Sequence, residues 1–195
     1  MKGNNIMERK VLVESSARHV HLSQQDVEAL FGKGATLIFK RALSQPGQFQ
    51  SEQRVDLVGP KNTIKNVAIL GPERKNTQVE LSYTDARNLG ITVPLRESGD
   101  TAGSTGLTLV GPVGSIDIPE GAIAAKRHIH ITPDEAAEYG IENGQIVSVK
   151  VEGERGIVFD NVVVRVNPNF KKAMHIDTDE ANAIGYCGET YGDIL

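Results

Sequence analysis

The chain has 195 residues, of which 39% are hydrophobic and 24% are charged, so it can bury a core as one large domain or two small ones. Its formal net charge of −4 excludes a broad basic surface for nucleic acid, and the sequence has no apolar run long enough to cross a bilayer. The single cysteine, Cys187, excludes an internal disulfide framework and is typical of a reducing compartment.

The first pattern in chain order is a pair of histidines two positions apart, in the motif RHVHLS at residues 18–23. The serine that ends this motif and Asp26, three positions later, are typical of a helix N-terminus, and Gly32 is typical of its end. We therefore predict a strand that ends in the two histidines and runs directly into a short helix over residues 24–30.

Short strands dominate the next part of the chain. Four apolar or β-branched runs are separated by turn residues, at positions 55–58, 67–70, 78–81 and 107–110. Three of these runs are followed at once by a Gly-Pro pair, and each pair should end a strand because proline lacks the N–H that a sheet needs. Many short strands at this spacing favour a β-barrel or a β-sandwich.

The histidine motif then recurs. Residues 127–132, with the sequence RHIHIT, match residues 18–23 position by position in kind. The threonine that ends this copy and the Pro-Asp-Glu that follows again predict a helix N-terminus. The second helix is predicted over residues 133–139 and ends at Gly140.

The C-terminal part has the same style, with predicted strands at residues 146–151 and 162–166. The predicted fold class is therefore mainly β, with short helices. A duplicated strand-and-helix unit indicates two related small β domains, which we place at residues 10–115 and 116–195 with a boundary near 114–125.

Four of the five histidines lie in the two motifs: His19, His21, His128 and His130. Side chains at positions i and i+2 of a strand point to the same face, so two imidazoles can bind one metal ion together with a third ligand. A single such pair is often only hydrogen-bonded or exposed, but two copies in a duplicated setting predict metal binding. The fifth, His175, lies in a strand-like segment, where Asp177 is placed to orient a ligand. Nitrogen ligands favour zinc and leave iron, cobalt, nickel and copper open.

Four segments, taken in order, resemble the phosphate acyltransferases of the propanediol-utilisation type: RHVHLS, GPERKNTQVELS, KRHIHIT and MHIDTDEAN. The resemblance runs from about Lys10 to the C-terminus. It implies two β-barrel domains with a dinuclear zinc site between them, and coenzyme A as a substrate. The implied reaction converts an acyl-CoA and phosphate reversibly to an acyl phosphate and coenzyme A.

The resemblance also implies six metal ligands. The first zinc ion would be bound by His19, His21 and His175, and the second by His128, His130 and Glu80. Glu80 has no local signal of its own, because it is one of many acidic residues on predicted strands. Arg74 is implied as the phosphate-binding and catalytic residue, with Arg18, Arg96 and Arg127 as the other arginines near the motifs. A planar guanidinium suits a phosphate because it can donate two parallel hydrogen bonds.

Coenzyme A contacts are implied at five positions: Ser15, Ser16, Ala17, Lys61 and Asn182. The three small residues let a ligand approach the backbone, the lysine would meet a phosphate of the nucleotide, and the asparagine offers an amide. The resemblance also implies a cation near the position of Ala68, so one phosphate contact is expected to be missing here. Residues 99–104 form a loop that is flexible by composition, either a cover for the substrate or a plain linker.

The expected mechanism is direct transfer between bound substrates at the zinc ions, without an acylated residue. Two alternatives remain open on the sequence: a metal-dependent acyl-CoA thioesterase that uses water, and a binding module in which the metals only stabilise the fold. The acyl chain, acetyl or propanoyl, and the oligomeric state, including a homo-oligomer, are also open.

The residues before Lys10 lack the apolar stretch of a secretory signal. They are also too few for a well-formed amphipathic helix of the kind that targets members of this family to bacterial microcompartments. We therefore expect a cytoplasmic enzyme rather than one in the lumen of a microcompartment.

Overall fold

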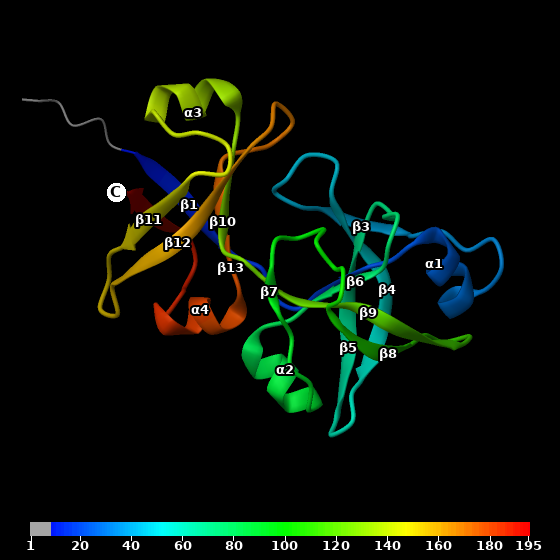
Figure 1. Cartoon of the computed structure of the whole chain (residues 1–195). Helices are drawn as coiled ribbons and strands as arrows, with labels where there is room; N and C mark the ends of the chain where they lie inside the picture. The colour runs from blue at the N-terminus through cyan, green and yellow to red at the C-terminus, as the bar shows by residue number, and fades with distance from the viewer. Residues whose placement is uncertain (1–8) are drawn as a thin grey trace, which may run out of the picture. The chain divides into compact units, whose positions relative to one another are not determined.

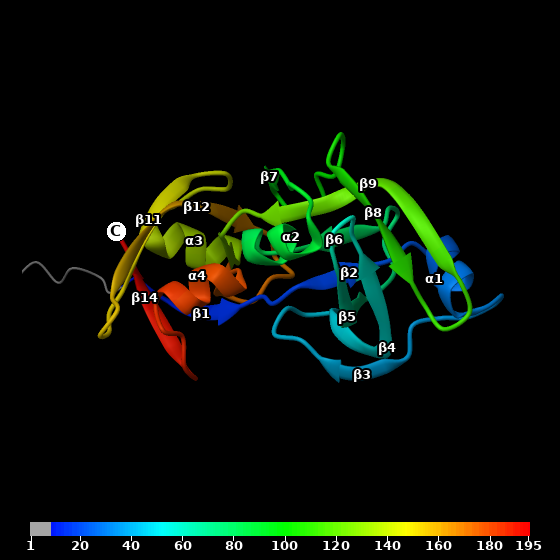
Figure 2. The same cartoon turned by 90° about the horizontal axis from the view of Figure 1, so that it is seen from below.

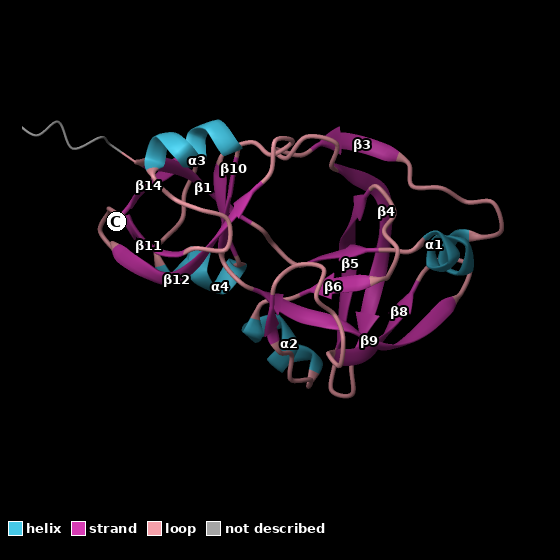
Figure 3. Cartoon of the chain, turned by 45° about the horizontal axis from the view of Figure 1, so that its top comes forward, coloured by secondary structure: helices cyan, strands magenta, loops and turns pink. Residues whose placement is uncertain are grey.

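A computed structural model describes residues 9–195 and shows a mainly β protein with four short helices in that range (Figures 1 and 3). The chain divides into two compact units. The first unit comprises Ala17–Lys126, and the second combines the residues up to Ser16 with Arg127–Leu195. The predicted fold class, two related β-barrel domains with short helices, is confirmed.

Six strands close into a ring in the first unit, in the order β2 (His19–His21), β5 (Thr63–Gly71), β4 (Phe49–Val58), β8 (Thr105–Val110), β9 (Ser115–Ala125) and β6 (Gln78–Glu80). The ring is closed because β8 pairs with both β4 and β9. Two short strands, β3 (Phe39–Ala42) and β7 (Leu95–Arg96), add to β4 and β9. Of its helices, α1 (Gln24–Phe31) packs against β9 (Figure 2), and α2 (Tyr83–Leu89) follows β6.

The second unit is also a closed six-stranded barrel, in the order β1 (Lys10–Ser15), β13 (Ala173–Ile176), β10 (His128–Ile131), β12 (Ile157–Val166), β11 (Ile146–Val151) and β14 (Thr190–Ile194). Its helices are α3 (Pro133–Tyr139), which follows β10, and α4 (Thr178–Ala183), which follows β13. Each barrel encloses its own core of fully buried apolar side chains, such as Val20 and Ile69 in the first unit and Ile129 and Met174 in the second.

The duplication covers the whole topology of each barrel. Each histidine strand pairs in parallel on one side, β2 with β5 and β10 with β12, and antiparallel on the other, β2 with β6 and β10 with β13. The next strand around the ring is again parallel, β9 beside β6 and β1 beside β13. The histidine motif visible in the sequence is therefore one part of a repeat that includes every strand of the two rings.

The division by contacts differs from the sequence-based boundaries. Residues 114–125, where we expected the boundary, contain the whole of β9, which pairs with β6 and β8 inside the first unit. Strand β1, dark blue in Figure 1, pairs instead with β13 and β14 of the second unit. Strands β1 and β9 are equivalent, because each directly precedes a histidine strand. However, β1 precedes β2 of the first unit but completes the barrel of the second unit, and β9 precedes β10 of the second unit but completes the barrel of the first. Sequence order alone does not show such an exchange.

The predicted helices are confirmed together with their capping residues. Helix α1 begins after Ser23, whose side chain accepts a hydrogen bond from the N–H of Asp26. Helix α3 begins with a capping box formed by Thr132 and Glu135, and ends at Gly140, whose left-handed backbone suits glycine. Each capping residue follows its histidine strand within two residues, so the two histidine side chains lie at the end of that strand.

In residues 9–195, no helix has both the length and the hydropathy needed to cross a bilayer. The expectation about targeting concerns the segment before Lys10, which apart from Arg9 lies outside the described residues.

The placement of β1 can be tested with Val13→Ala. Val13 is fully buried in the core of the second unit, opposite Met174 on β13, so losing its two methyl groups should cost about 1–3 kcal/mol. Native-state hydrogen exchange should show weaker protection of amides in β10 and β13, with little change in β5 and β6. Leu12→Ala, on the other face of β1 and only half-buried, is the control and should cost less. Equal loss of protection in β5 and β6 would contradict the exchange of strands.

Candidate metal centres

A first set of possible metal ligands lies in the first unit and consists of His19, His21 and Glu80. Each offers one ligand atom, and these atoms lie within 4.8 Å of one another. The two histidines point to the same face of β2, with ring centroids 4.9 Å apart. Glu80 joins them because β6 pairs antiparallel with β2 in the register that sets it opposite His19. All three side chains are almost fully buried.

Backbone carbonyls determine which nitrogen of each ring faces the set. Nδ1 of His19 lies 2.9 Å from the carbonyl oxygen of Ala17, and Nδ1 of His21 lies 3.1 Å from that of Leu70. A carbonyl oxygen only accepts hydrogen bonds, so both Nδ1 atoms carry the proton. In the neutral ring the lone pair is then on Nε2, which is the form that binds a metal ion.

Glu80 is held by side chains that the sequence analysis did not identify. The Ser98 hydroxyl donates to Oε1 of Glu80 at 2.7 Å, and the amide of Gln78 donates to the same oxygen at 2.6 Å. The Gln78 side-chain carbonyl in turn accepts from the N–H of Gly99 at 2.8 Å. These bonds leave Oε2 on the side of His19, whose Nε2 is 3.5 Å away.

The charges in this set are strongly coupled. Burial alone would lower the pKa of His19, but the Glu80 carboxylate outweighs it and raises the pKa of His19 above its ordinary value. Burial, together with the positive charges of His19 and Arg74, lowers the pKa of His21 to about 2. Burial also opposes ionisation of Glu80, yet the two histidines and the Ser98 hydroxyl hold the pKa of Glu80 well below its usual range. The metal-free set therefore carries one carboxylate, one neutral ring and one ring that readily takes a proton.

Arg74, the residue predicted to bind phosphate, lies beside this set. Its backbone N–H donates to the carbonyl of Leu22 at 2.8 Å, which attaches the turn after β5 to the end of β2. Its guanidinium donates to the Ser98 hydroxyl at 3.3 Å, and its charge contributes to lowering the pKa of His21. The structure thus brings together a cation, the hydroxyl that contacts Glu80, and the histidine pair.

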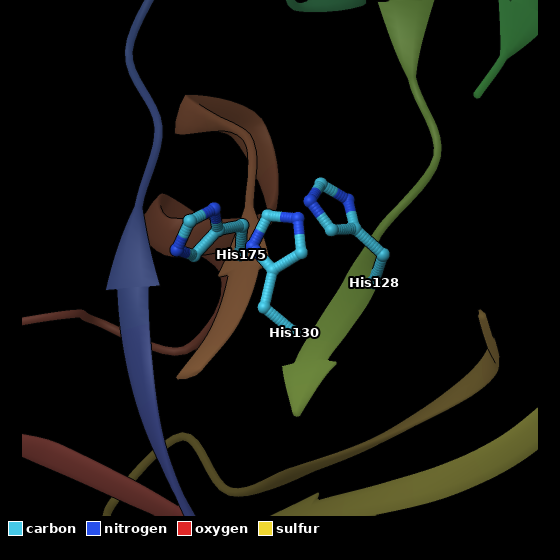
Figure 4. Close-up of side chains that lie close together, drawn as sticks. All are labelled: His128, His130 and His175. Carbon is cyan, nitrogen blue, oxygen red and sulfur yellow. The ribbon is translucent and has the colours of Figure 1, made fainter. Parts of the chain in front are cut away.

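A second set lies in the second unit and consists of His128, His130 and His175, whose ligand atoms also lie within 4.8 Å of one another. The first two residues are on β10 and the third is opposite His128 on β13. Figure 4 shows the three rings grouped together, and their centroids are 4.6–5.3 Å apart. Phe170 packs against His130, with the two ring centroids 4.2 Å apart. Oε2 of Glu14 lies 3.0 Å from Nε2 of His175.

The expected grouping of the ligands is corrected by these contacts. The sequence analysis assigned His175 to the pair on β2 and Glu80 to the pair on β10, whereas the structure places Glu80 with His19 and His21, and His175 with His128 and His130. The reason is strand register, because each antiparallel neighbour brings its donor opposite the first histidine of its own unit. Asp177 is also corrected: its carboxylate caps α4, and the carboxylate on His175 is Glu14.

The residues predicted to contact coenzyme A lie in several places. Ser15, Ser16 and Ala17 link β1 to β2, where the N–H of Ser16 donates to the carbonyl of Ile176 and the carbonyl of Ala17 accepts from His19. Lys61 is exposed in the turn between β4 and β5, and Asn182 is exposed on α4. Their contacts with coenzyme A stay predictions.

Two further expectations have a definite place in the first unit. Ala68 pairs with His19 across β5 and β2, so a cation there would have stood on the strand next to the ligands. The loop at residues 99–104 is attached at both ends, by Gly99 to Gln78 and by the Ser104 hydroxyl, which accepts from the N–H of Gly121 at 2.8 Å.

The sequence offered a weak signal for one of the missed residues. Gln78 is two positions before Glu80 on a strand, so its side chain must lie on the same face. Ser98 and Glu14 had no such signal, because their positions depend on pairing between distant strands.

A mainly β chain whose two barrels each bring together three possible metal ligands is typical of a metalloenzyme. The comparisons define the class further. A family model described as phosphate propanoyltransferase matches residues 12–187. A phosphate propanoyltransferase of Listeria monocytogenes is 51% identical over 190 residues, covering 97% of this chain and 89% of that protein. One of Salmonella typhimurium is 50% identical over 183 residues (93% and 87%), and one of Priestia megaterium is 57% identical over 168 residues (86% and 77%).

The chain therefore belongs to the phosphate propanoyltransferase family, as the four motifs indicated, and this membership supports an acyltransferase enzyme. Neither the thioesterase nor the binding module is favoured by these relatives.

The coupling of His19 and Glu80 can be tested in metal-free protein with Glu80→Gln. Only the hydrogen bond to the Ala17 carbonyl then opposes burial, so the pKa of His19 should fall from above to below its ordinary value of 6.5 in an NMR titration of labelled histidines. Because the pKa of His19 is raised in the folded state, protonation of His19 stabilises the fold below pH 6.5, and this stabilisation is lost as pH rises through the raised pKa. Because the pKa of Glu80 is lowered, its ionisation stabilises the fold above pH 4.5, and this stabilisation is lost as pH falls through the lowered pKa.

The stability lost in Glu80→Gln should consequently be greatest between pH 4.5 and 6.5, as measured by urea unfolding. Glu52→Gln, an exposed position in the same unit, is the matched control and should show no such window. An unchanged His19 titration in Glu80→Gln would contradict the coupling.

Proposed function

We propose that this protein is a phosphate acyltransferase that converts a short acyl-CoA, acetyl-CoA or propanoyl-CoA, and phosphate reversibly to an acyl phosphate and coenzyme A. The names of its relatives support the substrates phosphate and propanoyl. The observation that carries the proposal is the position of Arg74 beside a buried set of metal ligands, since this combination suits an anionic substrate next to a Lewis acid.

Each set of ligands fits one zinc ion. Imidazole nitrogen with at most one carboxylate is a donor set that zinc prefers, and three protein ligands leave a coordination position for a substrate. Two ligands bound about 2.1 Å from a tetrahedral ion lie about 3.4 Å apart. The 3.5 Å between Nε2 of His19 and Oε2 of Glu80 matches this separation, and it is long for a direct hydrogen bond. We infer one zinc ion in each unit; a single dinuclear site stays a prediction.

Bound zinc would stabilise negative charge on a substrate oxygen or sulfur. The protein itself contributes by holding the other participants. Arg74 would hold phosphate through two hydrogen bonds, and the attachment of its backbone to Leu22 limits how far the guanidinium moves relative to β2. The Ser98 hydroxyl, in contact with both Arg74 and Glu80, orients the cation and the carboxylate together.

The proposed chemistry is a direct transfer. A phosphate oxygen attacks the thioester carbonyl carbon, a C–O bond forms, the C–S bond breaks, and coenzyme A leaves as the thiolate. Fixing phosphate beside the thioester makes the attack effectively intramolecular, so no protein nucleophile is required. Small residues at Ser15, Ser16 and Ala17 would let coenzyme A approach the backbone beside β2, and Lys61 and Asn182 would contact it farther along its length.

Arg74 suits the phosphate better than the other arginines near the motifs. Its guanidinium contacts the Ser98 hydroxyl, which also contacts Glu80 of the ligand set. The guanidinium groups of Arg18 and Arg127 instead contact Asp85 and Glu180, both at 2.9 Å. Arg96 lies 3.8 Å from Asp100 in the loop after β7. A thioesterase would need no anion clamp for its attacking water, so the requirement for Arg74 separates the transferase from the hydrolase.

Metal analysis tests the ligand sets. Purified protein should contain close to two zinc ions per chain, because each unit supplies one complete set. His19→Ala and His128→Ala should each lose about one ion, and the double variant should lose both. Chelation should abolish activity and added zinc should restore it. Full metal content in the double variant would rule out these ligands.

Arg74→Ala tests the phosphate clamp. Loss of a bidentate, charge-assisted contact should lower kcat/KM for phosphate by roughly two to three decades, with metal content unchanged. Arg74→Lys should recover only part of the activity, since lysine keeps the charge and loses the planar pair of donors. The measurement is coenzyme A release from acetyl-CoA and propanoyl-CoA against phosphate concentration.

Arg87→Ala is the matched control, because Arg87 is an exposed arginine on α2 of the same unit. Release of coenzyme A at the same rate without phosphate would favour the thioesterase. Near wild-type phosphate dependence in Arg74→Ala would contradict the clamp.

A further inference from the structure

Residues 72–77 form the turn that carries Arg74, and we call this segment the clamp turn. It joins β5 to β6, the two strands that pair with the histidine strand β2 (Figure 2). The backbone of Arg74 forms a β-bridge with Ser23, the residue that caps α1. Thr77, at the other end of the clamp turn, is buried and also contacts Ser23. The turn therefore meets the start of α1 at both of these positions.

The hydroxyl of Thr77 lies within the cap of α1. It accepts a hydrogen bond from the N–H of Ser23 at 3.0 Å and donates one to Oδ2 of Asp26. The Ser23 hydroxyl donates to the same oxygen at 2.8 Å and accepts from the N–H of Asp26 at 3.2 Å. Because one hydroxyl can accept and donate at the same time, Thr77 connects the backbone of the capping residue to the carboxylate three positions later.

The second unit shows what this contact replaces. In α3 the N–H of the capping residue Thr132 donates directly to Oε2 of Glu135 at 3.2 Å, so the capping box is complete within one segment. The corresponding residue of α1 is Asp26, whose side chain is one methylene shorter, and there the N–H of Ser23 donates to Thr77 instead. The cap of α1 is thus completed by a residue of the clamp turn.

We propose that Thr77 is a positioning residue that sets the place of Arg74 by joining the clamp turn to the start of α1. The inference rests on the proposed role of Arg74 as the phosphate clamp. The N–H of Arg74 donates to the carbonyl of Leu22 at 2.8 Å, and the next residue, Ser23, donates to Thr77, so adjacent residues hold both ends of this part of the turn. A guanidinium on a long side chain needs a fixed backbone, since misplacing a contact by about 1 Å can cost about 100-fold in rate.

Thr77→Val tests the attachment, because valine keeps the shape of the side chain and lacks the hydroxyl. The KM for phosphate should rise roughly tenfold, while the KM for propanoyl-CoA and the zinc content stay unchanged, since only the place of Arg74 is altered. Thr77→Ser keeps the hydroxyl and should restore the KM for phosphate close to its wild-type value. If Thr77→Val is too unstable to assay, Thr77→Ala gives the same comparison with Thr77→Ser.

Amide hydrogen exchange of the full-length protein provides a readout that needs no substrate. The N–H of Arg74 should exchange roughly five- to tenfold faster in Thr77→Val, the effect of losing about one net hydrogen bond. Thr108→Val is the matched control, because the Thr108 hydroxyl also donates to a carboxylate, that of Asp117 at 2.5 Å, between β8 and β9. This control should change neither the KM for phosphate nor the exchange of Arg74.

An unchanged KM for phosphate in Thr77→Val, or the same rise in Thr77→Ser, would overturn the inference while leaving the proposed function intact. An equal rise in the KM for propanoyl-CoA would also overturn it, because that result indicates general damage to the fold. Wild-type protein whose release of coenzyme A does not depend on phosphate would overturn the proposed function. The exchange of the Arg74 amide would then still decide whether Thr77 holds the clamp turn.

Discussion

The register between each histidine strand and its antiparallel neighbour is the constraint on which both candidate metal centres depend. An extended strand places His19 and His21, or His128 and His130, on one face, but two imidazoles alone do not make a metal site. Pairing with β6 or β13 brings the third donor opposite the first histidine in each unit. A shift by one residue would turn that donor to the other face of the sheet, so the hydrogen bonds of the strands specify the ligand set. The buried rings of β2 are tolerated because backbone carbonyls accept their Nδ1 protons.

The duplicated barrels share this geometry through an exchange of strands. Strand β1 precedes the histidine strand β2 of the first unit, but it pairs with β13, which carries His175 in the second unit. Strand β9 precedes the histidine strand β10 of the second unit, but it pairs with β6, which carries Glu80 in the first unit. Each linker from such a strand to its histidine pair therefore joins the two units covalently. Ser16 and Ala17 lie in one linker, and Lys126 and Arg127 in the other. The small residues expected to contact coenzyme A thus belong to a segment that links the two units in the chain.

The parts that the sequence could predict are those with local causes. Gly-Pro pairs end β4, β5 and β8, and the caps at Ser23 and Thr132 begin α1 and α3 as expected. The histidine pairs were visible because their period of two is a local pattern. The third ligands, Ser98 and Glu14 depend on pairing between residues that are distant in sequence, and an isolated acid or serine on a strand does not show which neighbour it will meet. The same limit applies to residues 114–125, where the repeat suggested a domain boundary, because the pairing of β9 with β6 joins residues that are distant in sequence.

Two sets with the same scaffold acquire different chemistry from the residues around them. In the first unit Glu80 lies within the set, and burial, together with the positive charges of His19 and Arg74, lowers the pKa of His21 and keeps that ring neutral. In the second unit the donors are three histidines, an aromatic ring covers one of them, and the carboxylate of Glu14 lies behind another. A guanidinium such as that of Arg74 suits phosphate, whereas an apolar neighbour such as Phe170 disfavours water. Strand pairing therefore explains why each unit brings together three possible metal ligands, and the turns after β5 and β12, which carry Arg74 and Phe170, give the two sets different surroundings.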